Sequence, residues 1–273
     1  YMQNLYNTKL ISLWEKQSTG ISNFQFTEFI NEELVTIKSL DEQKKLVFIL
    51  ELIEKKIKNN FKLIKYLEEI NLKTFQYYSK FIFEVSNNSL KKKMEKKTLG
   101  EIGIEIESGN RPKGGINKNL KSGFPSVGAE SIQSAGIYDY SKTKYVEEEF
   151  FNKLKTGKIK NYDVALYKDG GKPGEFKPRV AIYGNNFPFK EFAINEHVFL
   201  LRSKVLGQPF LYNLISSKKV LNNLIVKASA KAAQPGLNQK EINSIEVNIP
   251  PEEIINEFNQ TSIKIINNQF YLG

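Results

Sequence analysis

The sequence predicts a mixed α/β (α+β) domain joined to long coiled-coil helices, and three observations lead to this fold class. An apolar seam that repeats every 3.5 residues or so (about two positions per heptad) runs through residues 41–84. Short β-type runs broken by Gly, Asn and Pro fill residues 98–250. A partial internal repeat indicates that a domain-plus-helix unit recurs along the chain and is read out of phase.

The composition favours a folded protein with a polyanionic partner. Hydrophobic residues make up 40% of the 273 residues, and aromatic residues 12%, which is enough for a real core. Lys and Arg total 40 against 30 Asp and Glu, so the formal net charge of +10 favours nucleic acid or an anionic membrane. An AT-rich genome that favours Lys and Asn codons is the alternative explanation, so charge alone does not decide for DNA.

Missing residue types and segments narrow the functions and locations that we expect. Cys is absent, which excludes disulfides, thiolate zinc sites and cysteine nucleophiles. No run of about 18 apolar residues could cross a membrane. Residues 1–13 lack the basic-then-apolar pattern of a signal peptide. We therefore expect a cytoplasmic protein without a membrane partner.

Residues 1–40 are interpreted as the C-terminal part of one domain, and residues 41–86 as a long coiled-coil helix. No Pro or Gly interrupts residues 41–83, and the helix would be roughly 65 Å long. Asn residues at seam positions would fix the register and the number of partners. The alternative is an amphipathic helix that lies on its own domain. The predicted seam consists of Leu46, Leu50, Ile53, Ile57, Asn60, Ile64, Leu67, Asn71, Thr74, Tyr78 and Phe81.

A basic linker at residues 87–97 leads into a domain at residues 98–250, after which residues 251–273 begin a second long helix. The linker is recognised by its Lys-rich, polar composition. Within the domain we expect a helix at Pro209–Ile225 and strands at Ile102–Ile106, Val164–Tyr167, Val180–Tyr183, Val198–Arg202 and Ile245–Ile249. The second helix would place Ile255, Phe258, Ile265 and Leu272 near one seam.

The internal repeat relates the segment before the first long helix to the segment before the second. Each copy has an opening Leu-Tyr-Asn, a turn containing Gly, a short helix leading into a strand, and an acidic helix start. These segments are Leu5–Asn7, Ser18–Ile21, Phe29–Ile37 and Asp41–Gln43 in the first copy, and Leu211–Asn213, Gln234–Leu237, Glu241–Ile249 and Pro250–Glu253 in the second.

Several short motifs in this order are typical of one family. They are Leu99–Ile102, Ser108–Pro112, Asp163–Leu166, Asp169–Gly174, Ala193–Glu196, Gln234–Asn238 and Ile249–Pro251, with Asp41–Gln43 at the first helix. In these motifs the chain resembles the specificity subunits of Type I restriction-modification enzymes, in a truncated, permuted or half-subunit form. A full family member has two recognition domains and two helices, whereas only residues 98–250 look complete here. Lys38-Ser39 also replaces the usual Pro at the first helix.

The resemblance implies a non-catalytic DNA-recognition subunit. Residues 98–250 would be a target-recognition domain for one half of a bipartite DNA target, and residues 1–40 part of another. The long helix would set the distance between two such domains, with a homodimer favoured over pairing within the chain. Methyltransferase subunits and a restriction subunit would be the protein partners. S-adenosylmethionine, ATP and Mg would be bound by those partners, and this chain would need no cofactor.

The candidate DNA-binding residues lie in loops that match the family motifs. Lys and Arg can contact phosphates, while Arg can bind guanine and Asn or Gln can bind adenine. The candidates are Asn110, Arg111, Lys113, Asn117, Lys118, Lys168, Lys172, Lys177, Arg179, Lys227, Ser229, Lys231 and Gln234.

Enzymatic motifs are missing from the sequence, so we predict no catalytic and no metal-binding residue. The single His, His197, is interpreted as a structural residue at a strand end. No P-loop and no Asn-Pro-Pro-aromatic motif of adenine methyltransferases occurs. The alternative function is a coiled-coil protein-interaction module without DNA binding. A stand-alone nuclease or methyltransferase is a third possibility that the missing motifs disfavour.

Overall fold

The computed structural model describes residues 2–18, 21–32, 37–84, 94–117, 119–128, 131, 133, 135–170, 176–184, 187, 189–229 and 236–273. The chain divides into two compact units, Tyr1–Lys55 and Lys56–Gly273. The division falls inside one long helix, so each unit is considered by itself.

The first unit is small and has a small aromatic core. Its elements are α1 (Met2–Asn7), the 3-10 helix η1 (Leu10–Trp14), the hairpin β1 (Glu15–Ser18) and β2 (Ile21–Phe24), and α2 (Phe26–Glu32). The rings of Trp14 and Phe29 lie edge to face with centroids 5.2 Å apart, and Trp14 Nε1 donates to Glu32 Oε2 at 3.2 Å. The strand predicted at the end of Phe29–Ile37 falls mostly on residues 33–36, outside the described residues.

Helix α3 (Leu40–Glu84) has the length that the heptad pattern predicts. Ser39 caps its N-terminus, because the Ser39 backbone N–H donates to Glu42 Oε2 at 3.0 Å and the Glu42 N–H reaches Ser39 Oγ at 3.4 Å. The hydrogen bonds from the side chain and backbone of Ser39 lower the pKa of Glu42. Ser39 therefore provides the start of this helix.

The second unit is built around an antiparallel sheet with strand order β4-β10-β7-β8. The strands are β4 (Glu105–Ser108), β10 (Val198–Arg202), β7 (Val164–Tyr167) and β8 (Val180–Ile182). The apolar runs of β7 and β10 are buried on both faces. On one face Leu166 and Phe199 join a core that includes residues of the helices, and on the other Ala165 and Leu200 pack with residues of a second sheet.

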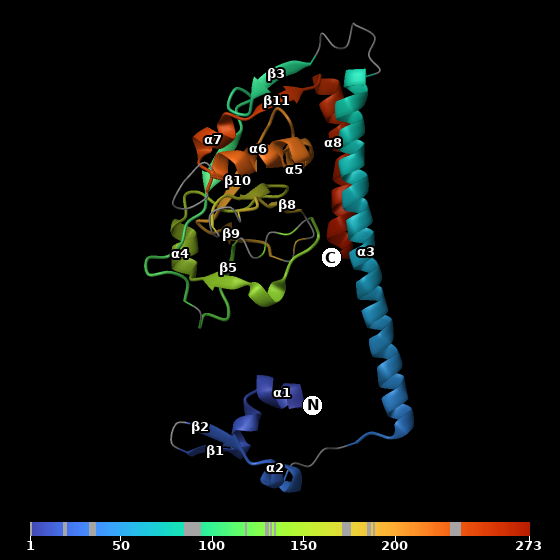
Figure 1. The fold of residues 1–273 in the computed structure, drawn as a ribbon, viewed down its shortest axis with the longest axis vertical. Coiled ribbons are helices and arrows are strands. Elements are labelled where there is room, and N and C mark those ends of the chain that lie inside the picture. The colour runs from blue at the N-terminus through green and yellow to red at the C-terminus, as the bar shows by residue number, and fades with distance from the viewer. Residues whose placement is uncertain are drawn as a thin grey trace. The chain divides into compact units, whose positions relative to one another are not determined.

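Helices α5 (Gln208–Ser216), α6 (Lys218–Ser229) and α8 (Glu252–Leu272) contribute to the first core, and Figure 1 shows α5 and α6 on one side of the β10 sheet. The second sheet has the order β6-β5-β9, from β6 (Lys144–Val146), β5 (Phe124–Val127) and β9 (Ala193–Ile194), with β5 and β9 parallel. A separate antiparallel pair joins β3 (Glu95–Thr98) to β11 (Glu246–Ile249). The remaining short elements are η4 (Tyr140–Lys142), α4 (Glu148–Lys153) and α7 (Gln239–Asn243).

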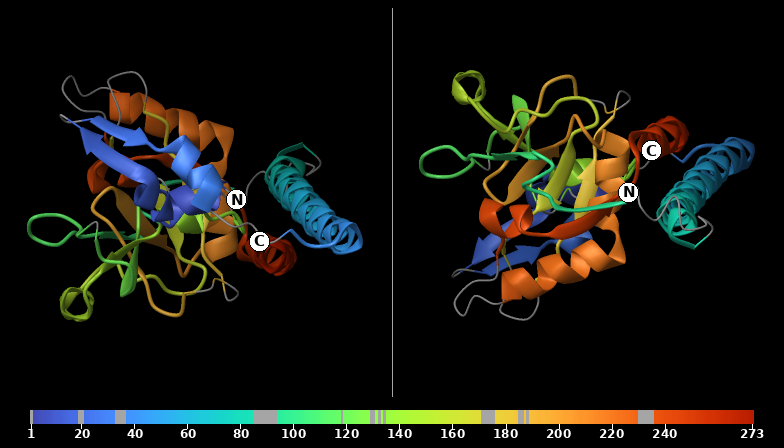
Figure 2. Two further views of the ribbon diagram at one scale, coloured as in Figure 1. Left: turned by 90° about the horizontal axis from the view of Figure 1, so that it is seen from below. Right: turned by 90° about the horizontal axis from the view of Figure 1, so that it is seen from above.

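The part of α3 that belongs to the second unit runs antiparallel to α8, and the two helices lie side by side in Figures 1 and 2. At one end Tyr78 OH donates to Glu257 Oε1 at 2.9 Å, and at the other Asn60 Nδ2 donates to the Leu272 carbonyl at 2.9 Å. Between them Phe75 packs edge to face on Phe258 with centroids 5.5 Å apart. Within the described residues, α3 thus pairs with α8 of the same chain, which is the arrangement that we favoured less than a homodimer; the homodimer stays a prediction.

Some sequence-based boundaries were wrong. Strand β4 begins at Glu105 instead of Ile102, because Ile102 and Ile104 point into the core from the turn before it. The helix expected at Pro209–Ile225 is two helices that meet at Ser217. Residues 95–97, assigned to the linker, are part of β3 because they pair with β11. The rest of the proposed domain division stays a prediction.

The buried stripes of the two long helices also differ slightly from the predicted seams. On α3 the most buried residues of the second unit are Ile64, Asn71 and Phe75, so the stripe passes through Phe75 beside the predicted Thr74. On α8 the stripe passes through Ile266 and not Ile265. A straight α-helix has about 3.6 residues per turn, so a strict heptad drifts off its buried face. The side chain of Phe81 lies outside the described residues.

None of the helices formed by the described residues is long and apolar enough to cross a membrane.

Candidate nucleic-acid interface

The topology of the β10 sheet brings three loops to one end of the second unit. Strands β4 and β7 both run antiparallel to β10, so their C-terminal ends lie beside the N-terminal end of β10. The loops after Ser108 and Tyr167 therefore meet the turn that precedes Val198. Two of the predicted DNA-binding loops share this end of the sheet.

A chain of ionisable side chains, called the charged network below, connects these loops. Arg111 Nη1 lies 3.2 Å from Glu196 Oε1, and His197 Nε2 lies 3.6 Å from the same oxygen. His197 Nδ1 lies 2.6 Å from Asp169 Oδ1, and the other carboxylate oxygen of Asp169 lies 3.8 Å from Lys168 Nζ. Residues that are far apart in the sequence thus form one continuous electrostatic network.

A cleft of about 720 Å³ opens beside this network. Arg111 and Asn117, both predicted candidates, line it together with Lys121, Lys142 and Lys144. Asp139 caps the turn that presents Lys142, and its Oδ2 lies 2.9 Å from Lys142 Nζ. The hydrogen bonds that Asp139 accepts, mainly from the Ser141 side chain and secondly from Lys142, lower its pKa. The cleft is therefore predominantly basic, with amide and hydroxyl groups between the cations.

The three Lys residues of the cleft were not among the sequence-based candidates. Lys142 and Lys144 lie in a short segment that is flanked by Tyr140 and Tyr145. Cations close to aromatic residues are a signal for nucleic-acid binding that could have identified them. Lys121 lies on a segment without any such pattern, so only the tertiary structure assigns it to the cleft.

The other candidates near this end differ in how accessible they are. Lys168 is largely buried, with Nζ 4.5 Å from the centroid of the Phe199 ring and 3.5 Å from Ser108 Oγ, so it braces the sheet end. Lys113 is exposed at the tip of its loop, and Asn110 Nδ2 donates to Thr156 Oγ1 at 3.4 Å. Arg111 is among the residues that line the cleft, whereas these three residues are not.

Arg179 and Lys177 are exposed just before β8, and the Arg179 guanidinium lies 5.1 Å from the centroid of the Tyr167 ring. Lys227 and Ser229 lie at the C-terminal end of α6. After the break in the described chain, Gly236 forms a β-bridge with Asp169, which returns the backbone to the same end of the sheet. Four candidates lie outside the described residues: Lys118, Lys172, Lys231 and Gln234.

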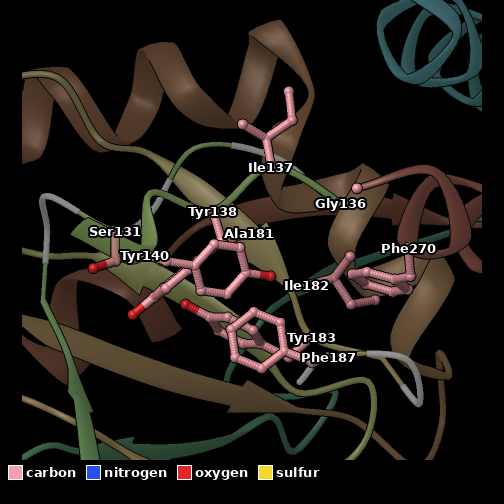
Figure 3. A pocket seen from close by; sticks show the side chains of 11 residues that line it. Ser131, Gly136, Ile137, Tyr138, Tyr140, Ala181, Ile182, Tyr183, Phe187 and Phe270 are labelled. Carbon is pink, nitrogen blue, oxygen red and sulfur yellow. The ribbon is translucent and has the colours of Figure 1, made fainter. Parts of the chain in front are cut away.

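An aromatic cluster supports one wall of the cleft. Tyr140, which lines the cleft, also lines a second pocket of about 30 Å³ (Figure 3). There the Tyr138 ring packs edge to face on Tyr140 and on Phe187, with centroid distances of 4.7 Å and 5.2 Å. Burial raises the pKa of Tyr183, whose ring packs on Phe187. The small pocket has no room for a nucleobase, so this cluster is a rigid support for the Lys-bearing segment.

A buried ion cluster lies towards the opposite end of the β10 sheet. Arg202 Nε donates to Asp163 Oδ1 at 2.6 Å, and its Nη1 donates to Glu107. Its hydrogen bonds to Asp163, whose side chain is 2% exposed, raise the pKa of Arg202. Glu107 also accepts from the Gly157 backbone N–H at 2.8 Å. Within the described part of the chain no group of three or more His, Asp or Glu side chains is arranged to hold a metal ion.

Comparisons with solved structures give likenesses at low sequence identity. An S subunit of a Type I restriction-modification system from M. genitalium has a TM-score of 0.48 at 19% identity, over 97% of this chain and 66% of that one. The HsdS subunit from Thermoanaerobacter tengcongensis has a TM-score of 0.42 at 14% identity, over 97% and 61%. A chain from a study of complex assembly and conformational transition of the type I R-M system has a TM-score of 0.44 at 12% identity, over 98% and 63%. This chain thus spans less than two thirds of each.

A search of curated protein sequences finds no match. The family described as Type I restriction modification DNA specificity domain matches residues 91–271, which is well over half of the chain. That range contains all the elements of the cleft and the charged network. The chain therefore belongs to the family of Type I restriction modification DNA specificity domains.

Proposed function

We propose that this chain is a DNA-recognition subunit of a Type I restriction-modification enzyme, and that residues 98–250 bind one half of a bipartite target. The observation that supports this most directly is the basic cleft, in which Arg111 and Asn117 lie among Lys121, Lys142 and Lys144. Ammonium groups bind phosphates without regard to sequence, whereas guanidinium and amide groups can distinguish bases. The cleft thus combines both kinds of group that sequence-specific binding needs.

The chain would contribute recognition and no catalysis. In this proposal the methyltransferase and restriction subunits hold S-adenosylmethionine, ATP and Mg, and the assembled complex acts on DNA in the cytoplasm. His197, the single His, lies beside the carboxylates of Asp169 and Glu196 and belongs to the charged network at the sheet end. These contacts favour the structural role that we predict for it.

Helix α3 would set the distance between two recognition domains. Its 45 residues correspond to a length of about 68 Å, more than one turn of DNA, which is about 34 Å. The predicted seam residues Leu46, Leu50, Ile53 and Ile57 are 46–60% exposed, although their pattern is that of a helix interface. We favour a second copy of this chain as their partner. Leu50→Lys should then convert a dimer into a monomer in analytical ultracentrifugation, and a wild-type chain that stays monomeric at every concentration would contradict the dimer.

A second apolar stripe on α3 supports the docking of methyltransferase subunits. Ile49, Leu52, Leu63, Tyr66 and Ile70 repeat with helical spacing on a face about 100° from the predicted seam, and all are about half exposed. Exposed apolar surface of this extent favours protein partners.

The same stripe is the observation that favours the alternative function, a coiled-coil interaction module without DNA binding. The dependence of binding affinity on salt concentration distinguishes the two functions. DNA binding releases counterions, so the affinity should fall by orders of magnitude between about 50 and 200 mM salt, whereas apolar docking should hardly change.

The test is fluorescence anisotropy of a labelled duplex with the full chain, alone and in complex with the methyltransferase subunit of its own system. Lys142→Ala should weaken binding to all sequences and reduce the salt slope by about one. Lys96→Ala is a matched control, because Lys96, like Lys142, is an exposed Lys in an ion pair, but it lies in the β3–β11 sheet and does not line the cleft. Absence of binding at low salt, or equal effects of the two substitutions, would overturn the DNA-binding function. Mapping of methylated adenines after incubation with the complex would then identify the bipartite target.

A further inference from the structure

We infer that Arg111 reads a guanine in the target half-site and that Glu196 is the positioning residue that aims it. This rests on the proposed function, because it names the base class that the same cleft would select. It assigns a role to Glu196, a residue that carries the wrong charge for binding phosphates.

Arg111 retains the donors that guanine needs. A guanidinium has five N–H donors in a planar fork, and among the described residues only the contact between Nη1 and Glu196 Oε1, at 3.2 Å, ties it to the protein. Its side chain is 59% exposed and lines the cleft, so the remaining donors are open to a ligand. Two parallel N–H groups match O6 and N7 of guanine in the major groove, and no other base presents two acceptors there.

The loop that bears Arg111 would be too free to read a base without an anchor. Gly114 and Gly115 both have positive φ, 87° and 92°, and the loop tip is exposed. Immobilising a long side chain at the moment of binding costs affinity. A contact that orients the guanidinium beforehand reduces that cost.

The backbone turn that presents Glu196 is held in place through its two neighbours. Its neighbour His197 is fixed by Asp169 at 2.6 Å, and the His197 backbone N–H donates to Asn195 Oδ1 at 3.0 Å. Asn195 is buried, and its N–H donates to the Val127 carbonyl at 2.9 Å. The turn that presents Glu196 is therefore rigid and connected to both sheets.

Gly109 brings the loop that bears Arg111 against this turn. A Cβ atom at this position would lie 2.0 Å from the Asn195 carbonyl oxygen, so only Gly allows so close an approach. The approach brings the root of the Arg111 loop beside the turn that holds Glu196. Together Gly109 and Glu196 fix where the guanidinium can lie.

The opposing explanation is that the Arg111–Glu196 pair is an ordinary surface ion pair, which contributes little to stability and nothing to recognition. The two explanations differ in what they predict for base preference. If Glu196 aims Arg111, then Glu196→Gln should reduce discrimination between bases while it increases overall affinity, because a negative charge beside the DNA is removed. A residue that serves only the fold would change binding to all sequences alike.

The experiment uses the full chain in complex with its methyltransferase and a pool of duplexes with a randomised half-site, sequenced before and after selection. Wild type should enrich G strongly at one position. Arg111→Lys should reduce that preference by roughly 5- to 150-fold, the range of one bidentate contact. Glu196→Gln should reduce it by roughly 1.5- to 5-fold and should raise the affinity for random DNA.

Lys113→Ala is the matched control, because Lys113 is an exposed cation on the same loop without a place in the network. It should weaken binding to all sequences and leave the base preference unchanged. Glu196→Asp keeps the negative charge but has a shorter side chain. Its affinity for random DNA should be as low as that of wild type, whereas its preference for G should be weaker than that of wild type. Circular dichroism of each variant shows whether it is folded.

The outcomes separate this inference from the function on which it rests. If the wild-type complex does not bind DNA, both fail. If it binds and selects bases, but Arg111→Lys and Glu196→Gln leave the preference intact, the inference is wrong and the proposed function stands. Equal losses on all sequences with Glu196→Gln would likewise reject the positioning role.

Discussion

Phe258 of α8 offers the sharpest test of how α8 packs with α3 and α5 within the second unit. Its side chain is fully buried, and its ring centroid lies 5.5 Å from that of Phe75, 5.6 Å from that of Phe210 and 5.8 Å from that of Tyr78. These three rings come from α3 and α5, so one side chain joins three helices. Phe258→Ala removes all three contacts at once.

The expected loss follows from burial and from the ring contacts. Transfer of a Phe side chain out of water contributes roughly 1.5–3 kcal/mol, and each aromatic pair adds about 0.5–1.5 kcal/mol. Measured Phe→Ala substitutions in cores cost about 3–5 kcal/mol. We therefore expect a decrease of about 4 kcal/mol in the free energy of unfolding, a large share of the stability of an ordinary domain.

Urea unfolding of the full chain measures this loss. Far-UV circular dichroism follows mainly the helices of the second unit, and its midpoint should fall by roughly 1.3–4 M, given a slope of about 1–3 kcal/mol/M. Trp14, the single Trp, lies in the first unit, and its fluorescence midpoint should not move because none of the Phe258 ring partners belongs to that unit.

Tyr271→Ala is the matched control, since Tyr271 is an aromatic residue of the same helix that is 81% exposed. It should change the free energy of unfolding by less than about 0.5 kcal/mol. The free energy of unfolding could instead fall by less than about 1 kcal/mol with Phe258→Ala, or by the same amount as with the control. Either result would show that the ring contacts of Phe258 do not hold α8 against α3 and α5.

Three further predictions concern the buried ion cluster, helix α3 and the loop that begins at Gly109. Arg202→Met leaves the buried Asp163 carboxylate without its ion-pair partner and should cost about 3–5 kcal/mol in chemical denaturation, while the double variant with Asp163→Leu should recover most of it; no recovery would contradict the pairing. Burial raises the pKa of Glu68, so folding favours its protonated form and stability falls as the pH rises through the interval between its ordinary and raised values. Glu68→Gln should accordingly be more stable than wild type at pH 8 and lose that advantage towards about pH 4, whereas an advantage independent of pH would rule out ionisation as the cause. Gly109→Ala forces a methyl group against the Asn195 carbonyl and should lower the thermal stability by about 1–3 kcal/mol, and an unchanged melting temperature would refute the close approach.

The long helix and the central strands could be predicted from the sequence because their signals are local. Residues 41–84 repeat apolar side chains with helical spacing, and the structure has the helix at Leu40–Glu84. The runs Val164–Tyr167 and Val198–Arg202 are strands with the predicted bounds, because an apolar run of this length needs burial on both faces of a sheet. The family could be predicted for the same reason, since its short motifs follow one another in a fixed order along the chain.

The candidate interface could be predicted only in part. Arg111 and Asn117 were chosen because of their residue types in a family-matching loop, and both line the cleft. Lys168 was chosen on the same grounds, yet it is largely buried against Phe199. A residue type indicates what a side chain can bind, but the packing around it decides whether a ligand can reach it.

What the sequence by itself determined is thus the set of elements with strong periodicity and the general chemistry of the loops. Only the tertiary structure decided which loops meet. Arg111 and Glu196 are distant in the chain but come within 3.2 Å, because β4 and β10 pair antiparallel and Gly109 permits a close backbone approach. The parallel pairing of β5 with β9 likewise joins distant segments. Periodicity reports only on neighbours along the chain, whereas a site is assembled by contacts across it, and these depend on the topology of the whole domain.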